Sequence, residues 1–291
     1  MRSLIISCIL FSTFLLTFPA GAQIGRRFPS EKKVVTDPLT GVQQTILTSS
    51  QSGNSKIYNT QRQWTADGKW LVFRSRRVPG ETLAVNEESG DIVQVTEGAY
   101  MGVQTLASKS MMLYFMRMNL RQVGQTKPGP VQIVEVDLEG LFADSEAGQL
   151  KAENEYQRVC GTIPAEVGAG GSMALDAGED WVYYRIGKAE AERRIASGMK
   201  IDANIGPGNM EEGPSGIGKM NIKTGETGLV VILPFQVGTI QANPSVPGEI
   251  VFCRESGDRA PRRSWTVMSD GSGLRPQGAG HGVQGTGRRA Q

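Results

Sequence analysis

Histidine is almost absent from this chain of 291 residues, and the one histidine, His281, lies in a glycine-rich stretch near the C-terminus. A single histidine excludes a metal cluster, a catalytic dyad or a triad built on histidines of this chain. Cysteine is scarce too, because only Cys160 and Cys253 lie beyond the first apolar segment. In an oxidising compartment these two thiols either pair or stay separate, since no disulfide framework is evident.

The chain also lacks a strong charge bias and a long apolar run. Its formal net charge is only +2, and its basic residues are scattered rather than interleaved with aromatics, which argues against a nucleic-acid partner. The apolar stretch Leu4 to Phe18 is shorter than the roughly 20 residues that span a membrane. It follows Arg2 and ends before Ala20-Gly21-Ala22, so we predict a secretory signal peptide over residues 1–22. The mature protein is then expected to be periplasmic or secreted, without a membrane attachment.

What the chain does contain is a repeated pattern in which a polar turn leads into a short apolar strand. The four strands that follow such turns are residues 70–73, 111–115, 181–184 and 249–252. Asp-Gly and Thr-Gly pairs in the turns supply the positive φ angles that tight hairpins need. The interval from Trp70 to Met112 matches the ~40–45 residues of a four-stranded propeller blade, and the later units are longer by a loop.

The repeats predict an all-β fold, a β-propeller of four-stranded antiparallel blades. About four blades are present, and we expect the chain to be truncated from a seven-bladed propeller, because the glycine-rich residues after 276 cannot supply a core strand. The predicted propeller covers residues 31–276, and residues 277–291 are predicted to be a disordered tail. Residues 43–48 are expected to be the strand that latches the last blade to the first. The charged segments 143–156 and 188–212 are expected to form short helices in loops.

Several segments resemble the oligogalacturonate lyases, a family of β-propeller polysaccharide lyases. The resemblance covers most of the mature chain in outline, together with Tyr58 and Gln61, and is specific mainly around residues 237–275. The segments that carry it are residues 37–45, 237–244, 250–255, 263–267 and 270–275. The turn and strand repeats are also similar, more distantly, to periplasmic propellers of the Tol system.

The resemblance implies cleavage of pectin-derived oligogalacturonides by β-elimination, with Mn²⁺ as the cofactor. Such lyases show histidine where this chain has Thr239 and Arg254, and their manganese ligands belong to blades beyond Arg275. Arg254, the candidate at the catalytic position, is a poor base because arginine stays protonated, but it is a good carboxylate ligand.

The other candidate substrate-binding residues are Arg263, Tyr58, Gln61 and Gln241. Arg254 and Arg263 flank one turn, where they either share a substrate carboxylate or are solvated loop arginines. The expected partner is an oligogalacturonide or another acidic oligosaccharide. The alternative is a non-catalytic periplasmic propeller that binds glycans or proteins on its loop face.

Overall fold

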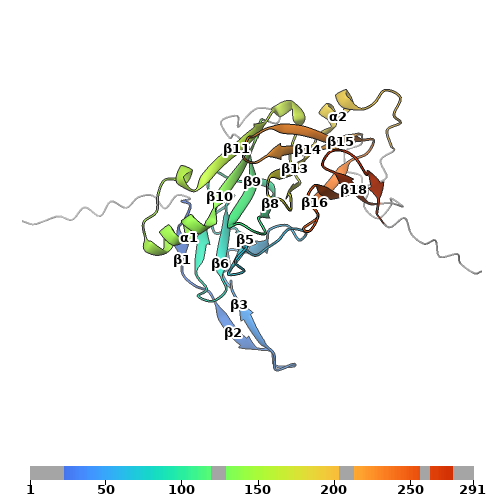
Figure 1. Cartoon of the computed structure of the whole chain (residues 1–291). Helices are drawn as coiled ribbons and strands as arrows, with labels where there is room; N and C mark the ends of the chain where they lie inside the picture. The colour runs from blue at the N-terminus through green and yellow to red at the C-terminus, as the bar shows by residue number, and fades with distance from the viewer. Residues whose placement is uncertain (1–22, 119–128, 203–212, 256–262, 278–291) are drawn as a thin grey trace, which may run out of the picture.

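The computed structural model describes residues 23–118, 129–202, 213–255 and 263–277, which form mainly antiparallel β-sheet (Figure 1). The predicted signal peptide and His281 lie outside the described residues, as does all but the first residue of the predicted tail. None of the described helices is long and apolar enough to cross a membrane.

Four sheets of four or five strands follow one another along the chain. In each, four consecutive strands form an antiparallel meander, and in the first sheet β1 adds to the edge beside β7. The first sheet contains, in spatial order, β1 (Arg27–Phe28), β7 (Ile92–Gln94), β6 (Thr82–Asn86), β5 (Trp70–Ser75) and β4 (Asn54–Lys56). The second contains β11 (Gln157–Ile163), β10 (Val131–Asp137), β9 (Met112–Met118) and β8 (Met101–Leu106). The third contains β12 (Met173–Leu175), β13 (Trp181–Ile186), β14 (Ser215–Asn221) and β15 (Thr227–Leu233). The fourth contains β16 (Val237–Ala242), β17 (Glu249–Arg254), β18 (Ser264–Met268) and β19 (Arg275–Pro276).

The predicted antiparallel units and their turns are confirmed. Four turn glycines have positive φ: Gly68 at 72°, Gly90 at 77°, Gly225 at 73° and Gly271 at 87°. In the turn before β13 the residue with positive φ is Glu179, at 59°, rather than Gly178. A side chain at Gly225 would also collide with the second sheet, because its Cβ would lie 2.8 Å from the carbonyl oxygen of Cys160. Gly225 therefore serves both the turn and the close approach of neighbouring sheets.

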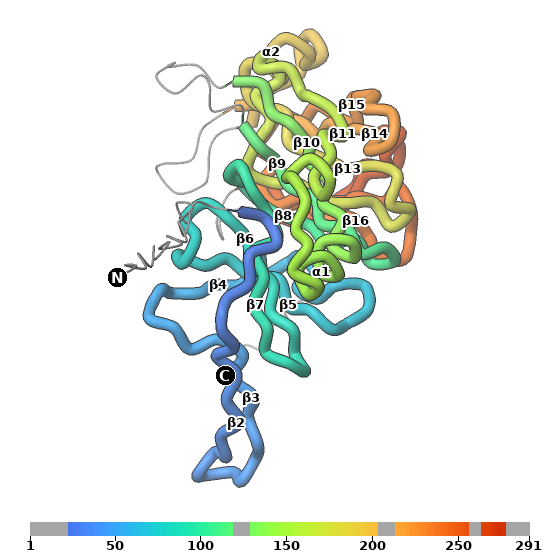
Figure 2. Tube along the Cα trace, turned by 90° about the vertical axis from the view of Figure 1, so that its left-hand side faces the viewer, coloured from blue at the N-terminus to red at the C-terminus, as the bar shows by residue number. Residues whose placement is uncertain are grey.

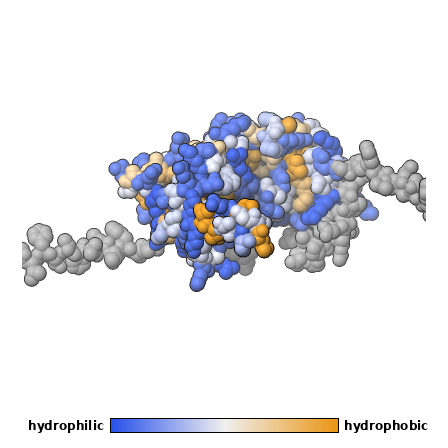
Figure 3. Space-filling model, turned by 90° about the horizontal axis from the view of Figure 1, so that it is seen from below, coloured by the Kyte–Doolittle hydropathy of each residue, from blue (hydrophilic) through white to orange (hydrophobic). Residues whose placement is uncertain are grey.

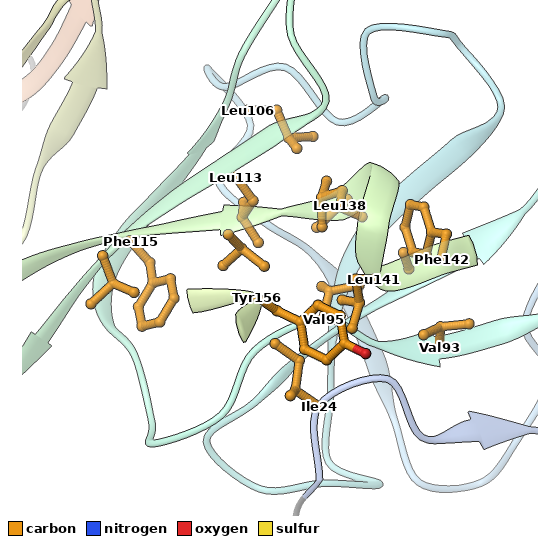
Figure 4. Close-up of a cluster of buried hydrophobic side chains, with 14 of the residues drawn as sticks. Ile24, Val93, Val95, Leu106, Leu113, Phe115, Leu138, Leu141, Phe142 and Tyr156 are labelled. Carbon is orange, nitrogen blue, oxygen red and sulfur yellow. The ribbon is translucent and has the colours of Figure 1, made fainter. Parts of the chain in front are cut away.

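Neighbouring sheets pack face to face through three apolar clusters, as blades of a propeller do. The period of two along each strand sends alternate residues to opposite faces: Leu113 and Phe115 pack toward the first sheet, whereas Tyr114 and Met116 pack toward the third. Figure 4 shows Phe115 in the cluster between the first two sheets. The repeats also lead us to expect that seven aromatic and apolar residues of these strands are mostly buried between blades; five of them are buried and two are partly buried. The buried ones are Phe73, Phe115, Tyr183, Ile250 and Phe252, and the partly buried ones are Trp70 and Trp181.

Short helices occur in both segments where they were expected. Helix α1 (Leu138–Ala147) begins earlier than expected because Asp137 Oδ1 accepts hydrogen bonds from the N–H groups of Glu139 and Gly140. A 3₁₀ turn, Glu153–Glu155, follows in the same segment, and another, Ala165–Val167, follows β11. Helix α2 (Lys188–Arg194) leads out of β13, and residues 203–212 of the second expected segment lie outside the described residues.

The expected latching strand takes a different partner. Residues Gln43–Ile46 form β3, which pairs with β2 (Lys33–Thr36) in a two-stranded hairpin that projects from the body (Figure 2). The turn favours this local pairing, because Asp37 Oδ1 accepts from the N–H groups of Leu39 and Thr40. Figure 3, viewed from the side on which the hairpin lies, shows apolar side chains near the middle of that face. The exposed apolar residues of the hairpin are Val34, Val35, Leu39, Val42 and Ile46.

Glu179 ties the third sheet to the second through one turn. Its carboxylate accepts from the backbone N–H groups of Ser108 and Lys109, each at 2.7 Å, and from the Ser110 hydroxyl at 2.8 Å. Burial alone would raise the pKa of Glu179, but these hydrogen bonds outweigh it and hold the pKa below its usual value.

We expect Glu179→Gln to lower the free energy of unfolding by about 1–2 kcal/mol at neutral pH, because an amide replaces a charged acceptor. A carboxyl whose folded pKa is depressed stabilises the fold above its unfolded pKa of about 4.3, and this contribution is lost as the pH falls through the folded pKa. Urea unfolding of both proteins at neutral pH and at about pH 3 should therefore show the difference shrinking in acid. A difference that stays constant with pH would contradict this role of the carboxylate.

Candidate functional site

Strands β4, β8, β12 and β16 are edge strands of the four sheets, and β8 and β16 both contact β12. The segment after β4 crosses to the other sheets. Gln61 Nε2 donates to the carbonyl oxygen of Met173 in β12 at 3.4 Å, and the Tyr58 hydroxyl lies 3.2 Å from Thr239 Oγ1 in β16. Tyr58 and Gln61 thus connect the first sheet to the third and fourth.

A cavity of about 290 Å³ lies at the ends of β8, β12 and β16, and the segment after β4 also contributes to it. Gln61 and Gln241 both line it, so the structure brings these two candidates together. Tyr58 is not among its lining residues. The remaining lining residues are Thr60, Arg62, Thr105, Leu106, Ser108, Ala174, Leu175, Asp176, Ala177, Ala242 and Pro244.

Arg254 lies at the end of β17 and is held on two sides. Its Nη1 is 3.0 Å from Asp202 Oδ2, and its Cζ lies 5.2 Å from the centre of the Phe235 ring. Only 16% of the Arg254 side chain is exposed. Asp202 and Phe235 were missed in the sequence because no motif surrounds them, although Asp202 lies in the charged segment that was expected to form a loop helix.

Arg263 lies opposite Arg254, across the connection from β17 to β18. Its carbonyl oxygen accepts from the Arg254 N–H at 2.7 Å, and its side chain is exposed. The backbone therefore brings the two arginines together at one end of the fourth sheet. A guanidinium offers five N–H donors in a fork, so this end of the sheet can ligate a carboxylate.

The two groups of candidate residues lie at opposite ends of the molecule. Because β16 and β17 are antiparallel, the end of β16, near Gln241, and the end of β17, at Arg254, face opposite ways. Tyr58 lies between them, since its partner Thr239 is in the middle of β16. A bulge in β16 between Val237 and Ile240 turns the Thr239 N–H toward Cys253 Sγ, 3.1 Å away.

The two cysteines are separate thiols in the structure. Cys160 is buried, and burial together with the nearby Glu135 carboxylate raises the pKa of its thiol to about 11. A thiol with such a pKa stays protonated at neutral pH and is a poor nucleophile. Cys160 is therefore a core residue.

The described residues do not fit a manganese site. Within the described ranges, no three histidine, cysteine, aspartate or glutamate side chains lie close enough together to hold a metal ion. Arg254 is a cationic guanidinium with N–H donors and no acceptor atom, so it cannot ligate a metal ion.

No family model matches the chain, and no curated protein matches it. The solved structures define the class of fold that it shares. The chain is similar to an oligogalacturonate lyase in complex with manganese, with a TM-score of 0.64 and 20% identity over 88% of this chain and 61% of that one. It is also similar to an oligogalacturonate lyase from Vibrio parahaemolyticus, with a TM-score of 0.63 and 20% identity over 87% and 61% of the two chains.

These likenesses confirm the resemblance as one of fold. The chain spans 61% of the length of both structures. A putative TolB from Agrobacterium tumefaciens is much less similar, with a TM-score of 0.34 and 10% identity over 81% of this chain and 83% of that one.

Proposed function

We propose that this protein recognises pectin-derived oligogalacturonides in the manner of an oligogalacturonate-lyase-type propeller. The observation that carries the proposal is the arginine pair at the end of β17, in a fold shared with two oligogalacturonate lyases over most of this chain. Arg254 and Arg263 would receive a uronate carboxylate through charge-assisted hydrogen bonds. The protein would do this in the periplasm or outside the cell, after removal of its signal peptide.

A lyase needs a general base as well as a group that binds the substrate carboxylate. β-Elimination removes the C5 proton of a uronate after its carboxylate charge is neutralised, and a general base must lie within hydrogen-bond reach of that proton. Arg254 can neutralise the carboxylate but cannot accept the proton. Recognition without cleavage, the role of a non-catalytic glycan-binding propeller, is therefore the second candidate function.

We expect Arg254→Ala to weaken binding of trigalacturonate at least tenfold, as measured by isothermal titration calorimetry. A charge-assisted hydrogen bond contributes about 1.4 kcal/mol or more to binding, and 1.4 kcal/mol corresponds to a tenfold change in affinity. Arg263→Ala should weaken binding less, because its side chain is exposed. Thermal unfolding of each variant would show whether the fold is kept.

Arg275→Ala is the matched control. Arg275 is also an arginine of the fourth sheet that is paired with a carboxylate, since its Nη2 lies 3.3 Å from Glu249 Oε1, but this pair is at the start of β17. Its loss should leave trigalacturonate binding unchanged. Equal binding by wild type, Arg254→Ala and Arg263→Ala would refute the site. Adding Mn²⁺ and following the unsaturated product in the ultraviolet separates the two candidate functions, since only a lyase releases it.

A further inference from the structure

A second hollow, of about 550 Å³, lies at the end of the first sheet. Arg74 and Ser75 from the end of β5, Arg76 after it, Asn54 from β4 and Tyr100 before β8 all line it. Two backbone hydrogen bonds frame the hollow, one from the Arg76 N–H to the carbonyl oxygen of Gly53 at 3.1 Å and one from the Tyr100 N–H to that of Gly80 at 3.2 Å. The segments that line the hollow are therefore held to one another by backbone hydrogen bonds.

The hollow carries positive charge that the described residues do not neutralise. Most arginines of the described ranges have a carboxylate within salt-bridge distance, among them Arg27, Arg77, Arg117, Arg158, Arg254 and Arg275. Within the same ranges, Arg74 and Arg76 have no such ion pair. Two guanidinium groups on one concave surface are the arrangement that binds oxoanions.

Two polar atoms at the hollow are buried without a hydrogen-bond partner in the part of the chain that the structure describes. One is a donor, Arg74 Nε, and the other is an acceptor, Asn54 Oδ1. A buried polar group without a partner destabilises the fold, so a ligand that satisfies both groups gains binding free energy from groups that are already desolvated. The ligand must offer an anionic acceptor and a hydroxyl donor together.

Tyr100 adds an aromatic surface and a protonated hydroxyl. Arg74 Cζ lies 5.9 Å from the centre of the Tyr100 ring. Burial raises the pKa of Tyr100, and Arg74 only partly offsets this, so the hydroxyl remains a donor at neutral pH. The loop before Tyr100 is fixed by Glu81, whose carboxylate accepts from the N–H groups of Gly98 and Ala99 at 3.1 and 2.9 Å. The negative charge of Glu81 is therefore already engaged with that loop.

We propose that this hollow is a binding site for a sugar acid, with the carboxylate on Arg74 and Arg76 and a ring hydroxyl donating to Asn54 Oδ1. Because β5 and β17 are each the second strand from the inner edge of their sheets, Arg74 and Arg254 lie at the same end of the molecule. The choice of a uronic acid as the ligand rests on the proposed function, whereas the site itself rests on the residues of the first sheet.

The test is titration of galacturonate, galactose and sulfate into wild type, Arg74→Gln and Arg76→Gln. We expect wild type to bind galacturonate and not galactose, and Arg74→Gln to lower the affinity at least tenfold. Arg74→Gln breaks no ion pair of the described residues and gives up only the contact with Tyr100, so it should keep the fold, which thermal unfolding would check. The exposed Arg76→Gln is a second variant that does not disturb the core. Lys69→Gln removes one positive charge just before β5, at its opposite end, and should bind like wild type.

The alternative outcomes overturn the proposal. Equal galacturonate affinity in wild type, Arg74→Gln and Arg76→Gln refutes the site. Absence of galacturonate binding to wild type also refutes it, and sulfate binding alone would reduce the hollow to a simple anion site. Titration of trigalacturonate separates this proposal from the proposed function. If Arg254→Ala lowers the affinity for trigalacturonate and Arg74→Gln does not, only the site proposed here is refuted. If Arg74→Gln lowers it and Arg254→Ala does not, only the site at the end of β17 is refuted.

Discussion

Replacing Phe115 by alanine should lower the free energy of unfolding by about 3–5 kcal/mol, the range seen when a large core aromatic is truncated. Phe115 is fully buried in β9 and belongs to a cluster with residues of both the first and the second sheet, including Val72, Val95 and Val134. Figure 4 labels Phe115 and Val95 in this cluster. The truncation removes apolar contacts from both sheets and leaves a cavity between them, which rigid sheets cannot close. Urea unfolding followed by tryptophan fluorescence would measure the change.

Leu229→Ala is the control for this prediction. Leu229 lies in β15 and is 45% exposed, so its truncation should cost well under 1 kcal/mol. A change of less than about 1 kcal/mol for Phe115→Ala would mean that the first two sheets do not depend on this cluster for their packing. That result would contradict the alternation of faces on which the whole arrangement of sheets rests.

The sheets could be predicted from the sequence because their signals are local. A turn such as Asp67-Gly68 and the alternation in Trp70 to Phe73 act within one hairpin, and each unit repeats them. The strand that pairs with residues 43–48 could not be predicted from the sequence. Pairing with the last strand of the chain, far away in sequence, competes with pairing to β2 across the short turn at residues 37–42. Pairing with β2 closes a much shorter loop and therefore costs less conformational entropy, so β2 is the partner.

The candidate site could be predicted only in part. The sequence pointed to Arg254 and Arg263, and the antiparallel pairing places them opposite each other. It could not show that Gln61 and Gln241 share a cavity at the other end, since that depends on how β4 leads across to β16. The sequence also did not point to Arg74, because an arginine near the end of a repeated apolar strand is common. Only the structure shows that Arg74 has no ion pair among the described residues.

Two acidic side chains also looked like ordinary turn residues in the sequence. Asp176 and Glu179 belong to one turn between β12 and β13, but Glu179 reaches back to the second sheet and Asp176 reaches forward to the fourth. Acidic residues are common in turns, but the side chains of these two accept hydrogen bonds from the turns of neighbouring sheets. Contacts of this kind join residues about 70 positions apart, and no local pattern encodes them.

Asp176→Ala should lower the free energy of unfolding by about 3 kcal/mol, because it removes one buried acceptor from several donors at once. Asp176 is 5% exposed. Its Oδ1 accepts from the Tyr183 hydroxyl at 3.0 Å and from the Gly248 N–H at 2.7 Å, and its Oδ2 accepts from the Gly178 N–H at 2.8 Å. Gly248 belongs to the turn before β17, so this carboxylate joins the third sheet to the fourth.

Two further variants separate the link between sheets from the turn itself. Tyr183→Phe removes one donor and should cost about 1 kcal/mol, because the carboxylate keeps its two N–H partners. Asp270→Ala is the matched control, since Asp270 is exposed and, among the residues that the structure describes, its side chain accepts hydrogen bonds only from Ser272 in its own turn. Its loss should cost less than about 1 kcal/mol. Chemical denaturation of the three variants should rank Asp176→Ala as the most destabilised. A cost for Asp176→Ala no larger than for Asp270→Ala would show that this carboxylate does not hold the third and fourth sheets together.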